Sequence, residues 1–320
     1  MHKLVWAVLI LFALLSPFTG TAELDLGALF EAGSLTQRIF FELRLPRILL
    51  AFVAGGTLAL AGLLFQTLFR NALMTPFTLG VSGGAVLGAG IAIKLGLSMA
   101  FGISAVSFFG FTGAFSTVIL LIVLSRYLKK AEQESLLLLG IALSFFYTSA
   151  LMVIFYLSSF TETATIMRFT MGSLSIVGYE SVISISVFSG FLLLTLWLKR
   201  FELQLLSISD EQASLKGVNT KQLTYLFLLI TSLAIGVLVS LTGPIGFIGL
   251  IIPHMLRKLY QRPVSSLIIP VFTLGGLFLL ACDTVARYFS TGSEIPIGVV
   301  TALIGGPFFI YLIISKQGQV

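Results

Sequence analysis

Two arginines stand where a long apolar stretch begins, Arg44 and Arg47 in RLPRILLAFVAGG. A guanidinium offers a planar fork of donors that binds a carboxylate bidentately, so the natural ligand of such a pair is an acidic group. A third arginine, Arg287, follows Asp283 by four residues inside another apolar stretch, a spacing that places both on one helix face. Charges within a membrane are costly and are paired or functional. Two interpretations are open: a simple ion pair, or an Arg287 held at the surface beside the other arginines with Asp283 anchoring its stem.

Other reactive side chains are scarce. The only histidines are His2 and His254, and the only cysteine, Cys282, lies in an apolar stretch. This excludes a disulfide framework and gives no metal-ligand set, so we expect no metal and no cofactor on this chain. No G-x-x-x-x-G-K-[ST] loop occurs, so ATP is not bound by that device. An enzyme is therefore not expected, and only a serine-based intramembrane mechanism stays open as an alternative.

The composition requires a membrane protein. Of the 320 residues, 57% are hydrophobic and 10% charged, with a mean hydropathy of +1.07. We therefore expect an all-α, polytopic fold in one domain, 1–320, with about ten spanning helices, one of them short and broken. The expected spans are 3–20, 47–69, 77–97, 101–125, 135–158, 181–198, 223–242, 244–256, 264–289 and 296–315. The first could instead be a cleaved signal peptide.

The distribution of positive charge gives the orientation. With the amino terminus inside, 13 of the 19 Lys and Arg residues fall in inner segments and 6 in outer ones. The prediction is a multi-pass protein of the cytoplasmic membrane with both termini cytoplasmic. Arg44 and Arg47 then face outward, against the general trend.

The longest inner polar segment, 199–223, has the signals of a two-turn helix, a glycine corner and a second helix. Ser209 and Gln212 have capping-box spacing, acidic residues fill the first turn, Gly217 suits a stop, and Asn219 can cap the next helix. A helix this short must dock on something: its own membrane domain or a cytoplasmic partner. The candidate partner-contact residues, within helices at about 207–222, are Ser209, Asp210, Glu211, Gly217, Val218 and Asn219.

The segment TGPIGFIGLIIPHMLRK, residues 242–258, concentrates glycine and proline around a short span. Broken helices occur at membrane depth where protein or a cavity satisfies the freed backbone groups. A translocation pathway and simple re-entrant packing both fit. The pathway or gate candidates are Gly243, Pro244 and Gly246, with Gly172 and Ser173 of the segment MGSLS.

Taken together, the motifs resemble the permease subunits of ABC importers for iron–siderophore chelates, haem and vitamin B12. The resemblance is carried from about 44 to 313 by RLPRILLAFVAGGTLALAGLLFQTLFRNAL, TLGVSGGAVLGA, MGSLS, GPIGFIGLIIPHMLR and DTVARYFSTGSEIPIGVVTALIGGPFFIYLI. The chain departs from the family pattern at Ala72 and Thr75, where the family has proline and often an acidic residue, and at Phe169, where it has tryptophan.

The resemblance implies a ten-helix permease of the bacterial inner membrane that works beside a second, identical or paralogous, permease chain. It implies two cytoplasmic ATPases, which carry ATP and Mg, and an external substrate-binding protein. Acidic residues of that binding protein would dock on Arg44, Arg47 and Arg287, and the helices at 209–222 would contact the ATPases. No nucleic acid is implied.

The expected function is translocation of a metal chelate, first a ferric siderophore because such substrates are common in the family. Haem, cobalamin or an oxyanion are alternatives for the same importer type. A less favoured alternative is an ion-coupled secondary transporter, which would need ionisable groups near mid-membrane where this chain has almost none besides Asp283.

Overall fold

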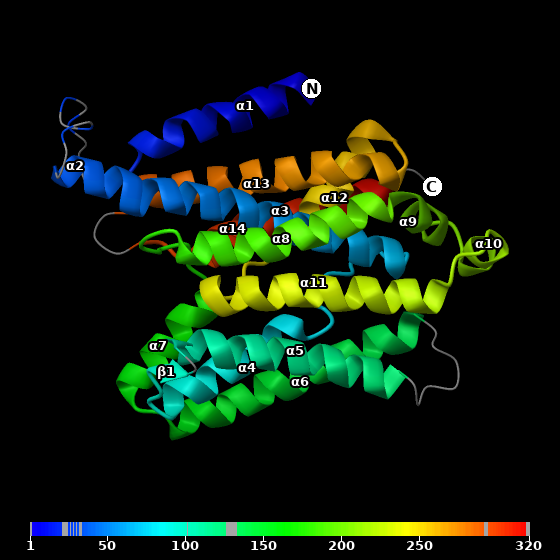
Figure 1. Cartoon of the computed structure of the whole chain (residues 1–320), viewed down its shortest axis with the longest axis horizontal. Coiled ribbons are helices and arrows are strands. Elements are labelled where there is room, and N and C mark those ends of the chain that lie inside the picture. Colours follow the sequence, from blue (N-terminus) through cyan, green and yellow to red (C-terminus); the bar gives the residue numbers. More distant parts are fainter. Residues whose placement is uncertain are drawn as a thin grey trace.

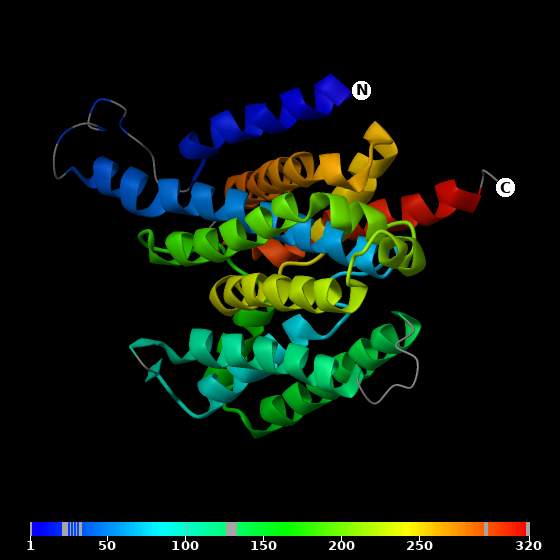
Figure 2. The same ribbon diagram turned by 45° about the vertical axis from the view of Figure 1, so that its right-hand side comes forward.

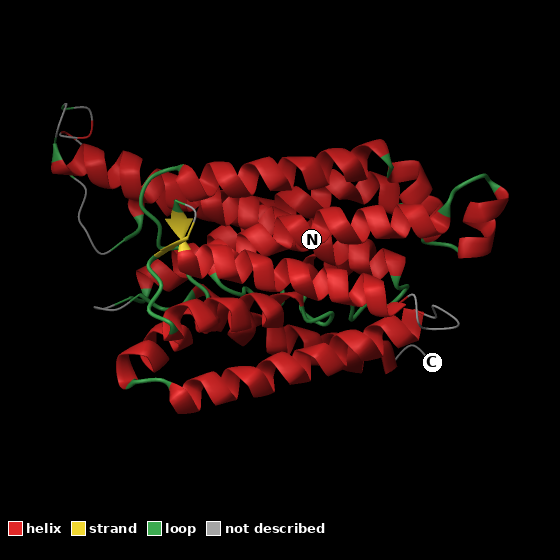
Figure 3. Ribbon diagram, turned by 60° about the horizontal axis from the view of Figure 1, so that its bottom comes forward, coloured by secondary structure: helices red, strands yellow, loops and turns green. Residues whose placement is uncertain are grey.

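The computed structural model describes residues 2–20, 25, 27, 29, 31, 34–100, 102–125, 133–290 and 294–317. These residues form a bundle of helices whose long axes run roughly side by side (Figures 1 and 2). The strands described are one short hairpin, β1 (Met99–Ala100) paired antiparallel with β2 (Ile103–Ser104) (Figure 3). The all-α prediction is confirmed.

Six helices of the described chain are long and apolar enough to cross a membrane. They are α3 (Leu45–Leu68) with its N-terminal extension, α5 (Ala105–Ser125), α6 (Gln133–Leu157), α8 (Glu180–Leu198), α11 (Thr220–Thr242) and α13 (Val264–Tyr288). Shorter apolar helices occur in α1 (His2–Leu15), α4 (Val81–Lys94) and α14 (Ile297–Gln317). With α12 (Ile248–Tyr260), every expected span contains a helix, whereas ten membrane crossings stay a prediction.

The broken span is present where it was expected. α11 ends at Thr242, residues 243–247 are irregular, and α12 covers only 13 residues with Pro253 inside it. Gly243 has a φ of +70°, which glycine adopts without strain, but Phe247 at the start of α12 also has a positive φ, +68°. A phenylalanine rarely adopts this left-handed backbone conformation, so the packing around Phe247 must hold it there.

Several elements lie outside the expected spans. α2 (Leu35–Arg38) and a π-helical turn, η3 (Ile39–Arg44), extend α3 toward its N-terminus. α7 (Phe160–Met171) is an amphipathic helix with a full capping box between Ser159 and Glu162. Ser159 and Glu162 have the three-residue spacing that is typical of a capping box. α9 (Arg200–Leu206) precedes the expected inner helix.

Glycine lets the central helices approach closely. A Cβ on Gly62 of α3 would lie 1.8 Å from the carbonyl oxygen of Gly249 in α12, and one on Gly88 of α4 would lie 2.0 Å from that of Phe109 in α5. Lipid removes the hydrophobic drive between helices, so contacts of this kind hold the bundle together. The glycine-rich stretch 81–90 thus packs closely against α5.

The bundle has two ends, called here the α2 end and the α10 end. α2 lies at the left in Figure 1, and α10 (Asp210–Leu215) projects at the right beyond the long helices. α1 runs from near the middle of the bundle's length toward the α2 end, and the described end of α14 lies toward the α10 end (Figures 1 and 2). The segment with Arg44 and the segment 209–222 are therefore at opposite ends.

Candidate functional site

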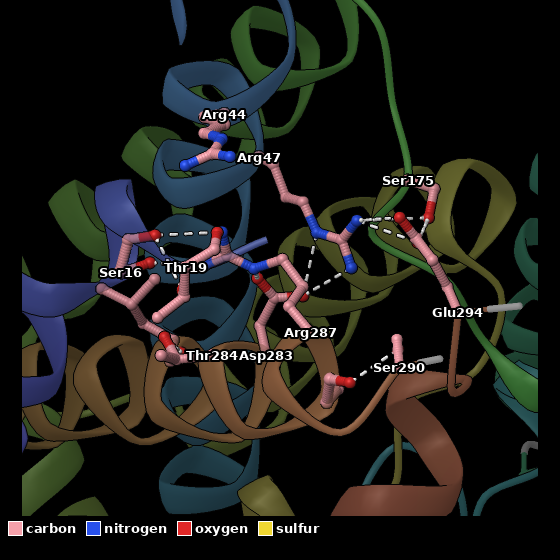
Figure 4. A network of polar contacts seen from close by, with 12 residues as sticks. Ser16, Thr19, Arg44, Arg47, Ser175, Asp283, Thr284, Arg287, Ser290 and Glu294 are labelled. Atoms are coloured by element: carbon pink, nitrogen blue, oxygen red, sulfur yellow. Dashed lines mark hydrogen bonds and ion pairs between the residues drawn. The ribbon is translucent and has the colours of Figure 1, made fainter. Parts of the chain in front are cut away.

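The three expected arginines meet at the α2 end in one cluster, defined here as Arg44, Arg47, Asp283, Arg287 and Glu294 (Figure 4). Asp283 is at its centre and is fully buried. Its Oδ1 lies 2.9 Å from Nη2 of Arg47, and its Oδ2 lies 2.9 Å from Nε of Arg287. One buried carboxylate thus neutralises charge from two helices, α3 and α13, which is the pairing that a buried ion requires.

Glu294 binds the other side of Arg47. Nη1 of Arg47 donates to both carboxylate oxygens of Glu294, at 2.8 and 2.9 Å. Ser175, in the loop between α7 and α8, also donates to Glu294 (Figure 4). Partial burial alone would raise the pKa of Glu294, but the Ser175 hydrogen bond and the Arg47 charge outweigh it and hold that pKa below its usual range.

Arg44 and Arg287 bind the end of the first helix. α1 continues into a 3-10 turn, η1 (Ser16–Phe18). Arg287 donates to the carbonyl oxygens of Ser16 at 3.0 Å and Thr19 at 2.8 Å, and Arg44 donates to that of Pro17 at 2.7 Å. Carbonyl groups at a helix C-terminus lack partners and carry partial negative charge, so arginine is a suitable cap.

Burial corrects one of the two interpretations of Arg287. The ion pair with Asp283 forms, but Arg287 is only 7% exposed, so the interpretation that holds it at the surface is wrong. Arg44 is similarly buried at 6%, because its side chain turns toward η1. The Arg47 side chain is 11% exposed and that of Glu294 is 51% exposed. Sequence reasoning missed Glu294 and Ser175, and no local signal marked either.

The segment at the α10 end folds as expected, with one difference in length. Ser209 caps α10 by accepting from the backbone of Gln212 at 3.0 Å, and Asn219 caps α11 by accepting from Gln222 at 3.1 Å. α10 has six residues, fewer than the two turns expected. Its end is a Schellman motif, in which Val218 donates to Ala213 at 3.0 Å and the amide of Gly217 donates to Ser214 at 2.9 Å.

This coupling segment, defined as residues 207–222, projects from the bundle. Gly217 has a φ of +81° and no atom within 4 Å of where its Cβ would stand. Leu215 is 87% exposed and Glu211 is also exposed. Asp210 pairs with Arg70, next to the end of α3, so the projecting helix is tied to a central helix of the bundle.

The gate candidates come together from two separate segments. The amide of Ser173 donates to the carbonyl of Thr242 at 2.7 Å. A Cβ on Gly172 would lie 2.6 Å from the carbonyl oxygen of Pro244, and one on Gly243 would lie 3.1 Å from the Cα of Gly172. Beside them is a cavity of about 560 Å³. It is lined by Phe77, Thr170, Met171, Pro244, Gly246, Phe247, Gly298, Val299, Ala302 and Leu303.

The described residues contain no group of three or more His, Cys, Asp or Glu side chains placed to hold a metal ion. Cys282 is buried beside Asp283 and forms no disulfide. These residues place guanidinium groups bound to carboxylates at the α2 end and an exposed, capped segment at the α10 end.

Comparison with known proteins agrees with this geometry. The FecCD transport family matches residues 8–315. A Helicobacter pylori protein named "Probable iron chelatin transport system permease protein" is 34% identical over 88% of this chain and 83% of its own length. The hemin transport system permease protein HmuU of Yersinia pestis is 34% identical over 98% of this chain and 94% of its own.

A solved structure described as an inward-facing conformation of an ABC transporter assigned to the metal-chelate type superposes with a TM-score of 0.83. It is 30% identical and covers 97% of this chain and 96% of its own. The helices, the closed cluster at one end and the projecting segment at the other thus occur in a chain whose relatives are named as transport permeases. This chain belongs to the FecCD transport family, the ABC importer permease subunits that its motifs resemble.

Proposed function

We propose that the chain is the membrane subunit of an ATP-driven importer for a metal chelate, a ferric siderophore first, handed over by a substrate-binding protein. The observation that carries this proposal is the placement of two different contact sites at opposite ends of one bundle. The arginine cluster lies at the α2 end, and the coupling segment projects at the α10 end. Haem, cobalamin and an oxyanion are the alternative substrates.

The coupling segment has the properties of a contact surface for a cytoplasmic ATPase. It is stiffened by caps at both helix starts and by the Schellman motif, and it presents Leu215 almost fully to its surroundings. Its pairing with Arg70 joins it to α3. Movement imposed on α10 by ATP-driven closure would therefore reach the centre of the bundle.

The arginine cluster suits a partner that carries carboxylates. Its three arginines exceed its two acids by one positive charge. All three arginines are largely buried, with Arg47 slightly more exposed than Arg44 and Arg287, and together they give the cluster a favourable field for a carboxylate. The binding protein would use acidic side chains, which steer association and fix its register.

The pathway would run along the cavity beside Gly172, Ser173, Gly243, Pro244 and Gly246, between this chain and a second permease chain. The lining side chains are apolar apart from Thr170, so the cavity offers a bulky chelate passage without a tight site. In this proposal the chain crosses the bacterial inner membrane ten times and has both termini in the cytoplasm. Alternating access then opens the pathway to one side at a time.

An ion-coupled mechanism is disfavoured by the state of Asp283. A coupling ion needs a carboxylate that can exchange partners, whereas both oxygens of Asp283 contact arginines. ATP and Mg would bind in the separate ATPase subunits.

Uptake by the reconstituted importer tests the proposal. The permease, the ATPases and the binding protein are assembled in vesicles, and accumulation of a ferric chelate is measured with and without ATP. Arg47→Glu should abolish binding-protein docking and uptake while leaving permease pairing intact. Arg168→Glu, at an exposed arginine on α7 outside the cluster, is the control and should transport normally. Uptake without ATP would refute the proposal, and unchanged uptake by Arg47→Glu would refute the docking role.

A further inference from the structure

The two carboxylates bound to Arg47 are not equivalent. Asp283 is fully buried and is shared with Arg287, so nothing from outside the chain can replace it. Glu294 has a half-exposed side chain and occupies the other side of Arg47, with both of its oxygens on one nitrogen. Any acidic group that approaches Arg47 from outside meets Glu294 first.

Glu294 also connects the cluster to the cavity. It accepts from Ser175, which lies two residues after the gate candidate Ser173 in the loop joining α7 to α8. That loop starts where Met171 lines the cavity and where the backbone of Ser173 is bound to Thr242. On its other side, Glu294 precedes α14, whose Gly298 also lines the cavity.

We propose that Glu294 is an internal stand-in for the carboxylate of the docking partner. An acidic side chain of the substrate-binding protein takes its place on Arg47, and the displaced Glu294 gives up Ser175. The loop 172–179 then loses its contact with the segment before α14, at the edge of the cavity. Docking of the binding protein and release of this loop are therefore the same event, the exchange of one carboxylate for another on the Arg47 guanidinium.

The exchange is physically balanced. Arg47 keeps two carboxylate partners before and after docking, so no buried charge is left without a counter-ion. Displaced Glu294 moves into water, where half of its side chain already lies. The contact that is lost is an ion pair near the surface, the kind with small net strength, so it can serve as a reversible latch.

The inference rests on the proposed function. It predicts the opposite change in docking from the one expected if Glu294 only held Arg47 in position. Glu294→Gln removes the competing charge but keeps an oxygen that can accept from Ser175. We expect the binding protein to dock on this variant about twofold to fivefold more tightly, the scale of one near-surface ion pair. If Glu294 instead held Arg47 in place for the partner, the same variant would dock more weakly.

Docking is measured on the permease–ATPase complex in nanodiscs, with the substrate-binding protein of the same importer as the probe. Glu162→Gln is the matched control, because Glu162 pairs with Lys94 at 3.0 Å outside the cluster, and its docking should be unchanged. A spin label at Val177, which is 76% exposed in the loop, reports loop mobility. Mobility should rise on docking in the unmodified protein and should already be high in Ser175→Ala.

Weaker or unchanged docking of Glu294→Gln, while the unmodified chain docks normally, would overturn the inference and leave the proposed function standing. Loop mobility that does not change on docking would overturn the latch in the same way. Failure of the unmodified chain to dock would instead refute the proposed function, and the inference with it.

Discussion

The two ends of the bundle hold their polar side chains in opposite ways. At the α2 end, charged side chains are turned inward and every arginine of the cluster is bound within the chain. At the α10 end, the coupling segment is held by backbone caps and leaves its side chains exposed. Under the proposed function, a partner at the α2 end would exchange an existing contact, whereas one at the α10 end would add a contact to an open surface. The first arrangement would then favour transient binding and the second permanent binding.

The largest effect is expected at the centre of the cluster. Asp283→Asn leaves Arg47 and Arg287 buried without their shared counter-charge and should lower the free energy of unfolding by about 3–5 kcal/mol. Asp210→Asn, which removes the half-exposed partner of Arg70 at the other end, should cost less than about 1 kcal/mol. Unfolding in detergent measures both, and equal losses would show that the two ends do not differ in this way.

At the α10 end, the main effect should be on binding and not on stability. Leu215→Ala removes an apolar side chain that only a partner can bury, so ATPase association should weaken by about 1–2 kcal/mol, roughly tenfold. Leu198→Ala, at an exposed leucine on the spanning helix α8, is the control and should not change association. Titration of the solubilised permease with the ATPase measures the dissociation constant of each variant. If Leu215→Ala mainly unfolds the permease, the segment is an internal support.

Gly217 tests whether the shape of the coupling segment matters. Gly217→Val forces a branched residue to a φ of +81° at a local cost of about 1–2 kcal/mol, with no clash because the surrounding space is open. ATP hydrolysis should continue while uptake falls. Gly190→Val, at a helical glycine with equally open space, should transport normally. Normal coupling in Gly217→Val would argue against a role for the corner.

The smallest effect is the pH dependence of the Arg47–Glu294 contact. The pKa of Glu294 is lowered on folding, so the contact stabilises the chain above the ordinary glutamate pKa and is lost as pH falls through the lowered value. The difference in unfolding free energy between the unmodified protein and Glu294→Gln should be below about 1 kcal/mol at neutral pH and vanish in acid. A difference that grows toward acid would contradict the assigned direction.

Local features were predictable from the sequence. The helices, the broken span and the Ser209 and Asn219 caps depend on apolar length, glycine, proline and side chains within four residues. The cluster was predictable only in part. The pair Asp283 and Arg287 follows from helical spacing, but Arg47 meets Glu294 across 247 positions, and Arg287 meets Ser16 across 271. Such contacts depend on how helices pack, and no local pattern records that.

The π-helical turn at Ile39–Arg44 has a consequence for the direction of the chain before it. A turn of this kind holds an extra residue relative to an α-helical turn and widens the helix locally. Each residue of the wider turn rotates the chain by less than the about 100° of an α-helical residue, so the extra residue is absorbed and α2 keeps nearly the angle that an uninterrupted helix would give it. Deleting Phe41 would let the turn close as α-helix with little rotation of α2, and an unchanged distance between spin labels on α2 and α13 would report that tolerance.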